Sequence, residues 1–87
     1  MKLSFDIHCE EFTDNPSYRI FVNNNLVIER DFVVPEFEMG YYRFLGYYNL
    51  PNGENIVNIQ GLTGNFTLGK MWVEDNEIPH DNGRFIL

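Results

Sequence analysis

The amino-acid sequence predicts an all-β protein, an antiparallel β-sandwich of jelly-roll-like type with about seven short strands. Three observations lead to this prediction. Apolar and polar residues alternate with a period of two, turn residues recur roughly every 8–12 residues, and no window has a helical period. Aromatic residues make up 16% of the chain. Two packed sheets would cover both aromatic-rich faces, and a β-barrel of the same strands is the main alternative.

The first predicted strand covers residues 2–9, where apolar residues at odd positions alternate with polar ones. Its last apolar residue, Cys9, is the single cysteine of the chain, so no disulfide within the chain is expected. We interpret Cys9 as a small buried hydrophobic residue. Residues 10–17 form a predicted loop, because they contain an Asp-Asn-Pro turn signal.

A predicted β-hairpin follows this loop. Residues 18–22 alternate as a second strand, and the three asparagines at 23–25 form its turn, because Asn tolerates the positive φ that two-residue loops need. The return strand covers residues 26–33. On this strand we expect Leu26 and Ile28 to share one face.

The second half of the chain supplies the remaining strands, which are predicted over residues 41–50, 56–59, 66–73 and 84–87. The clearest turn is the Leu-Pro-Asn-Gly run at 50–53, where Pro sets φ and Gly supplies a positive-φ position. Gly69 predicts a bulge or a sharp bend. Residues 36–40 read as a linker, and residues 63–65, 75–79 and 81–83 read as turns. We expect the whole chain, residues 1–87, to form one domain.

The aromatic-rich strand provides the candidate contact residues. Strand alternation puts one set of side chains on one face and a second set on the other: Tyr41, Arg43, Leu45 and Tyr47, against Tyr42, Phe44 and Tyr48. One face must cover the core. The other face is either buried between sheets as well, or exposed as a platform for stacking on sugars or docking on protein. The candidate partner or glycan contacts are Tyr42, Tyr48 and Trp72.

Charge and hydropathy exclude several partners. The net charge is −7, and the six basic residues are scattered singly, so binding to nucleic acid is not expected. No apolar run approaches the roughly 20 residues that span a membrane. Asp6 and His8 interrupt the apolar character of the N-terminal segment, so we expect no signal peptide and synthesis in a cytoplasm.

Catalytic and metal-binding motifs are not recognisable. Nucleophilic catalysis needs a serine or cysteine placed against a histidine and a carboxylate, and no such motif is visible. We therefore expect a protein that is not an enzyme, with no catalytic, cofactor-binding or metal-ligating residues. Calcium is an alternative at two acidic loops, residues 10–15 and 74–82, although their spacing matches no EF-hand and acidic loops are usually solvated turns.

Several short segments resemble small uncharacterised proteins of marine tailed phages, especially cyanophages. The segments are Phe5-Asp6-Ile7, Cys9-Glu10, Phe12, Asp14-Asn15-Pro16, Tyr18-Arg19-Ile20, Val22-Asn23, Glu29-Arg30-Asp31-Phe32, Leu50-Pro51-Asn52-Gly53 and Val73-Glu74. The resemblance covers most of the chain. It implies a virion component, assembled in the host cytoplasm, that decorates or cements the capsid or belongs to a fibre.

The run Gly-Glu-Asn-Ile-Val-Asn-Ile at 53–59 also resembles a strand of small calcium-dependent xylan-binding modules. The late strand departs from those modules, because it ends Val73-Glu74-Asp75-Asn76 where they read Val-x-Val-Asn-Gly. The leading expectation is thus a structural accessory protein of a phage particle, and the alternative is a carbohydrate-binding module. DNA mimicry by the acidic surface fits less well, because the acidic residues cluster at two loops.

Overall fold

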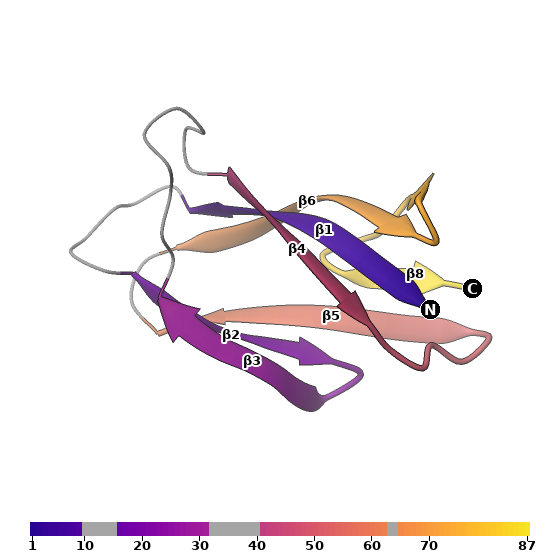
Figure 1. The fold of residues 1–87 in the computed structure, drawn as a ribbon, viewed down its shortest axis with the longest axis horizontal. Helices are drawn as coiled ribbons and strands as arrows, with labels where there is room; N and C mark the ends of the chain where they lie inside the picture. The colour runs from indigo at the N-terminus through magenta and orange to yellow at the C-terminus, as the bar shows by residue number, and fades with distance from the viewer. Residues whose placement is uncertain (10–15, 32–40, 63–64) are drawn as a thin grey trace.

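A computed structural model describes residues 1–9, 16–31, 41–62 and 65–87 (Figure 1). These residues form eight strands and no helix. The strands are β1 (Lys2–Cys9), β2 (Ser17–Val22), β3 (Asn25–Asp31), β4 (Tyr41–Tyr47), β5 (Glu54–Gly61), β6 (Phe66–Val73), β7 (Asn76–Ile78) and β8 (Arg84–Ile86). The predicted loop at 10–15, the linker at 36–40, the end of the strand predicted over 26–33 and the turn residues 63–64 lie outside the described residues.

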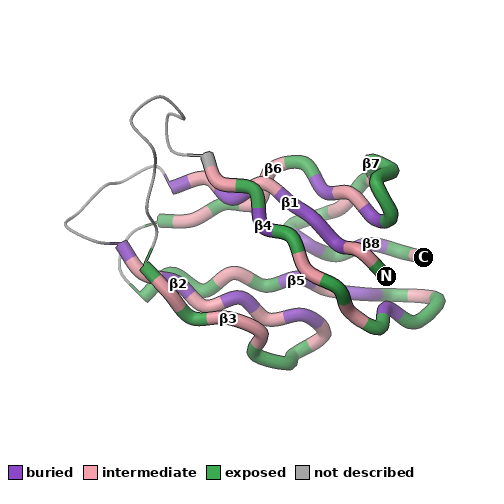
Figure 2. Tube along the Cα trace, viewed as in Figure 1, coloured by how far each residue is buried: buried purple, intermediate pink, exposed green. Residues whose placement is uncertain are grey.

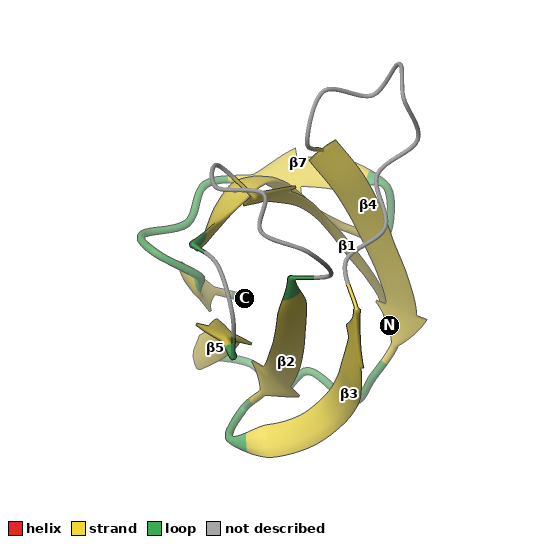
Figure 3. Ribbon diagram, turned by 90° about the vertical axis from the view of Figure 1, so that its left-hand side faces the viewer, coloured by secondary structure: helices red, strands yellow, loops and turns green. Residues whose placement is uncertain are grey.

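The strands form two antiparallel sheets that pack together, so the predicted β-sandwich is confirmed. The first sheet has the order β4-β1-β6-β7 and the second the order β3-β2-β5-β8. Viewed nearly along the strands, the two sheets lie on opposite sides of a shared interior (Figure 3). The one strand that the sequence did not predict is β7. The turn expected over residues 75–79 is instead a two-residue turn at Glu74 and Asp75, which both have positive φ, and β7 follows it at once.

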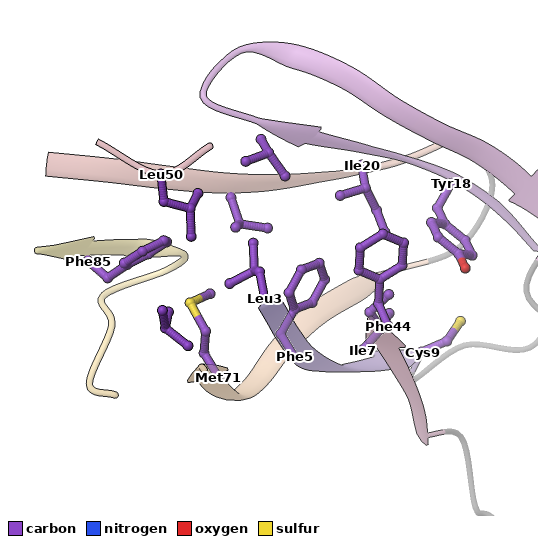
Figure 4. Close-up of a cluster of buried hydrophobic side chains, with 13 residues drawn as sticks. Leu3, Phe5, Ile7, Cys9, Tyr18, Ile20, Phe44, Leu50, Met71 and Phe85 are labelled. Carbon is purple, nitrogen blue, oxygen red and sulfur yellow. The ribbon is translucent and has the colours of Figure 1, made fainter. Parts of the chain in front are cut away.

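The core is built from the inward-facing residues of both sheets (Figures 2 and 4). Its thirteen buried hydrophobic members are Leu3, Phe5, Ile7, Cys9, Tyr18, Ile20, Val22, Phe44, Leu50, Val57, Met71, Val73 and Phe85. The rings of Phe5 and Phe44 stack with centroids 5.0 Å apart. The burial of Cys9 agrees with the prediction. Burying rings of this size supplies much apolar area per residue, which a chain of 87 residues needs.

The predicted hairpin turn between β2 and β3 is also present. Asn23 and Asn24 have φ values of 49° and 66°, the left-handed conformation that Asn adopts more readily than most residues. Gly53 has a φ of 104° in the turn after Leu50, as the Leu-Pro-Asn-Gly pattern predicted. These two turns lie at the same end of the sandwich, because the Asn23 backbone N–H donates to the carbonyl oxygen of Ile56 at 2.8 Å.

The predicted arrangement of β3 is wrong in one respect. Leu26 and Ile28 do not share a face, because the register against β2 shifts between Ile20 and Phe21. Ile28 lies opposite Ile20 and packs on the core, whereas Leu26 lies opposite Phe21 and is 54% exposed. One extra residue, Val27, forms the bulge that reverses the alternation. A similar shift between β1 and β6 occurs at Gly69, so the predicted bulge there is confirmed.

Candidate functional site

The structure decides which face of β4 covers the core. Phe44 is 6% exposed and stacks on Phe5, so the even-numbered residues of β4 point inward. The odd-numbered residues point away from the core: Leu45 is 49% exposed and Tyr47 is 71% exposed. Leu45 and Tyr47 are therefore more exposed than Tyr42, the candidate contact residue on this strand, which is half-buried.

Tyr42 takes part in a bridge between the two sheets. The guanidinium of Arg30, on β3, lies 4.6 Å from the centroid of the Tyr42 ring on β4. The same side chain donates from Nε to the hydroxyl oxygen of Tyr18 at 2.7 Å. Arg30 thus joins two tyrosines from opposite sheets, because it donates a hydrogen bond to Tyr18 and lies over the Tyr42 ring. This location gives Tyr42 a role in closing the sandwich.

The buried Tyr18 predicts a loss of stability at alkaline pH. Burial raises the pKa of the Tyr18 hydroxyl above its ordinary value of 10.0, and the Arg30 contact opposes this effect without cancelling it. The folded state therefore keeps a proton that the unfolded chain loses above about pH 10. The free energy of unfolding should be level up to that pH and then fall. Urea denaturation between about pH 8 and 11 measures it.

The control for this prediction is Tyr18→Phe. This variant loses the hydrogen bond from Arg30, so its free energy of unfolding is lower at every pH, but it should decrease less steeply above pH 10. Part of the decrease remains, because burial raises the pKa of Tyr48 in the same direction. Equal slopes for the two proteins would contradict the assignment to Tyr18.

Tyr48 is half-buried beside the end of β4. Its ring lies against Gly46, where a Cβ atom would overlap the ring. It also packs on the hydrophobic core, and its pKa is raised by burial. The Tyr48 ring is therefore partly covered by Gly46 and by the core residues that it contacts. Together with Tyr42, it fills space between the sheets, and neither ring lies on a free platform.

Trp72, the third candidate, lies on the outer face of the first sheet. Its neighbours Met71 and Val73 are buried in the core, so alternation along β6 directs Trp72 outward. Ser4 of β1 pairs with Trp72 on one side and with Leu45 of β4 on the other. Ser4 is only 7% exposed although it faces outward, because larger neighbours flank it. Leu45, Ser4 and Trp72 thus form a continuous row across three strands.

Arg43 lies beside this row, two residues before Leu45 on β4. Its Nε donates to Oδ1 of Asp6, directly opposite on β1, at 2.9 Å. Its guanidinium carbon lies 4.2 Å from the centroid of the Trp72 ring. The hydrogen bond to Asp6 raises the pKa of Arg43 further, so the guanidinium stays charged at every ordinary pH. We call Asp6, Arg43 and Trp72 the Arg43 site.

The candidate functional site is the outer face of the first sheet, defined by Ser4, Leu45, Tyr47 and the Arg43 site. At one end of this face Lys2, paired with Tyr47 across β1 and β4, donates to Asp75 at 2.7 Å. The sequence grouped Arg43, Leu45 and Tyr47 correctly on one face but did not identify that face as exposed. Arg43 was the available signal, because a charged side chain marks the solvent side of a half-buried strand.

The metal expectations have separate outcomes. The first acidic loop, residues 10–15, lies outside the described residues. In the part of the chain that the structure describes, no three His, Cys, Asp or Glu side chains gather closely enough to hold a metal ion. The second acidic loop includes Asp75, which pairs with Lys2, and Glu74, whose Oε1 accepts the backbone N–H of Lys2. These carboxylates fix the β6–β7 turn to β1.

A small pocket of about 220 Å³ lies between β5 and β6. Its lining consists of Val57, Asn58, Ile59, Phe66, Thr67, Leu68 and Asn82. None of these side chains titrates near neutral pH, so the pocket supplies no group for acid–base chemistry. This pocket is therefore a weaker candidate for function than the outer face of the first sheet.

Among the described residues, no helix has the length and apolar character needed to cross a membrane. Comparison of the chain with models of known families, with curated proteins and with solved structures finds no match.

Proposed function

We propose that this chain is a non-enzymatic accessory structural protein of a phage particle, which decorates or cements the capsid or belongs to a fibre. In this proposal it docks on another virion protein through the outer face of the first sheet. The observation that carries the docking role is the pair Leu45 and Tyr47, which are 49% and 71% exposed on the outer sheet face that also holds Trp72. The part of the proposal that assigns the protein to a virion rests on the sequence resemblance.

The chemistry of this face supports protein docking. Protein interfaces are enriched in Tyr, Trp and Arg, which combine large apolar area with polar tips, and Tyr47, Trp72 and Arg43 supply these types on this face. The β-strands already order the backbone that carries these side chains, so binding need not order the backbone again. An exposed sheet face of this kind fits a complementary protein surface better than a small molecule, which prefers a concave site.

Carbohydrate binding is the second candidate, because the exposed ring of Tyr47 is suited to stacking on a sugar. Trp72 supports it less, since the Arg43 guanidinium already covers one side of its ring at 4.2 Å. A glycan array with and without EDTA tests this candidate. Binding that EDTA abolishes would favour a calcium-dependent module, and an array without signal would count against it.

Two measurements test the particle role. Mass spectrometry of purified virions should detect the protein in many copies per particle, and the purified protein should rebind particles that lack it. Absence from the virion would overturn the proposal. The copy number also separates a capsid protein from a fibre protein, because capsid sites repeat far more often.

Matched leucine variants should locate the docking face. Leu45→Ala, on the first sheet, should weaken binding to the particle by about tenfold or more, because truncating an anchor in an interface centre costs 1–2 kcal/mol or more. Leu26→Ala is the control, since Leu26 has a similar exposure of 54% and lies on the outer face of the second sheet. It should bind like the unchanged protein. A larger effect from Leu26→Ala would place the interface on the opposite sheet.

A further inference from the structure

We propose that the Arg43 site receives a single carboxylate of the docked protein partner, presented by an Asp, a Glu or a C-terminus. This inference rests on the proposed docking role and names the chemistry of the partner at the centre of the face. In the described part of the chain, Arg43 is held so that its Nε is engaged, whereas its two terminal nitrogens are open.

Arg43 is fixed from two directions by its own chain. Nε donates to Asp6 at 2.9 Å, and the guanidinium lies over Trp72 at 4.2 Å. The Asp6 side chain is 22% exposed, whereas that of Arg43 is 59% exposed, so the carboxylate lies beneath and the arginine above. An arginine anchored through Nε and one ring has lost most of its rotamer freedom before any ligand arrives.

The two terminal nitrogens of Arg43 are the open part. Among the described residues, the only hydrogen bond of this guanidinium is the one from Nε. The terminal N–H groups form a planar fork whose geometry matches the two oxygens of a carboxylate. Lys2, another cation of this face, already donates to Asp75 at 2.7 Å. Arg43 is therefore the better-placed donor for an incoming anion.

The surroundings of Arg43 favour a protein carboxylate. Leu45 is adjacent on the same strand face and needs an apolar partner, which a protein surface supplies around an acidic side chain. An acidic sugar bound to Arg43 could not stack on the side of the Trp72 ring that the guanidinium covers. The chain has a net charge of −7, so a polyanion would be repelled as a whole. One carboxylate in a neutral or basic surface meets both conditions.

Trp72 provides a direct test, because it is the only tryptophan of the chain and lies under Arg43. The probes are two capped peptides, acetyl-Leu-Asp-Leu-amide and acetyl-Leu-Asn-Leu-amide, titrated to about 20 mM. Trp72 fluorescence and backbone amide chemical shifts are followed together. The Asp peptide should bind with a millimolar dissociation constant, about tenfold more tightly than the Asn peptide.

Two variants test whether the peptide is bound by a prearranged guanidinium fork or only by a positive charge. Arg43→Lys keeps the charge but loses the fork, so the preference for the Asp peptide should disappear. Asp6→Asn removes a negative charge, which alone would tighten anion binding, but it also weakens the anchor of Nε. We expect weaker binding. Tighter binding to Asp6→Asn would show that charge alone attracts the peptide and would overturn the proposal.

The remaining outcomes are equally decisive. Equal binding of the two peptides, or an Asp preference that survives in Arg43→Lys, overturns the inference. Saturable binding of glucuronate without binding of the Asp peptide overturns it in favour of an acidic sugar. On particles, loss of docking by Leu45→Ala with unchanged docking by Arg43→Lys contradicts this inference and leaves the proposed function intact. Peptide binding by a protein that docks on no particle overturns the proposed function alone.

Discussion

Gly83→Ala should destabilise the protein by about 3–5 kcal/mol, a large part of the stability of a domain of this size. Gly83 has a φ of 89° and is buried, so a side chain here would be strained and would have no space. A Cβ atom would overlap the carbonyl oxygen of Val57 and lie 3.0 Å from Cδ1 of Leu68. Urea denaturation followed by circular dichroism measures the change.

Gly83 cannot move away from this clash without breaking other contacts. Its carbonyl oxygen accepts the N–H of Val57 at 2.9 Å, which extends the pairing of β8 with β5. Its own N–H donates to Nδ1 of His80 at 3.0 Å, and the other ring nitrogen of His80 donates to the carbonyl oxygen of Gly69 at 2.5 Å. His80 thereby links the β7–β8 connection to β6. A shift at residue 83 would disturb all three bonds.

Gly53→Ala is the matched control. Gly53 also has a positive φ, 104°, but no atom lies within 4 Å of the place where a Cβ would stand. The free energy of unfolding of this variant should fall only by the cost of the backbone strain, about 1–2 kcal/mol. Equal losses for the two variants would contradict the steric argument, because they would leave backbone conformation as the whole cause.

The parts of the fold that depend on local chemistry could be predicted from the sequence. In β1 and β2 the alternation is regular, and every predicted inward residue from Leu3 to Val22 that the structure describes is buried. The Asn23–Asn24 turn was predictable because few residues accept positive φ. Gly69 was predictable as a bulge for a similar reason, since glycine fits where a strand bends.

The parts that depend on partners far along the chain could not be predicted. Nothing around Val27 marks a bulge, because the register is set by packing against β2 and not by the residue itself. The Arg43 site needs residues 6, 43 and 72, which lie on three strands whose order the sequence does not reveal. Alternation predicted the two faces of β4 but not their surroundings, so it could not show that Leu45 and Tyr47 are more exposed than Tyr42.

Asn55 is a second case in which a polar residue has a role that the pattern did not suggest. It is 1% exposed on β5, at a position where alternation favours an apolar side chain. Its amide nitrogen donates to the carbonyl oxygens of Pro51 at 2.9 Å and Gly53 at 3.2 Å. Its amide oxygen accepts from the side chain of Asn23 at 2.9 Å. One buried amide therefore joins the turn after Leu50 to the β2–β3 hairpin.

Asn55→Asp should lower the free energy of unfolding by about 3–5 kcal/mol at pH 7. The carboxylate keeps the acceptor for Asn23 but places a second oxygen against the carbonyl oxygens of Pro51 and Gly53, where the amide donated. It also buries a charge, so the carboxyl should be protonated more readily in the folded state than in the unfolded chain. The unfolded chain then loses its proton first as the pH rises, which lowers stability above about pH 4.

The defect of Asn55→Asp should therefore shrink when the pH is lowered towards 4, because a protonated carboxyl again donates a hydrogen bond. Asn58→Asp is the matched control, since Asn58 is an exposed residue of the same strand. It should change stability by less than about 0.5 kcal/mol at either pH. If the two variants lost the same stability, or if the defect at residue 55 did not depend on pH, the buried amide would not be the element that holds the two turns together.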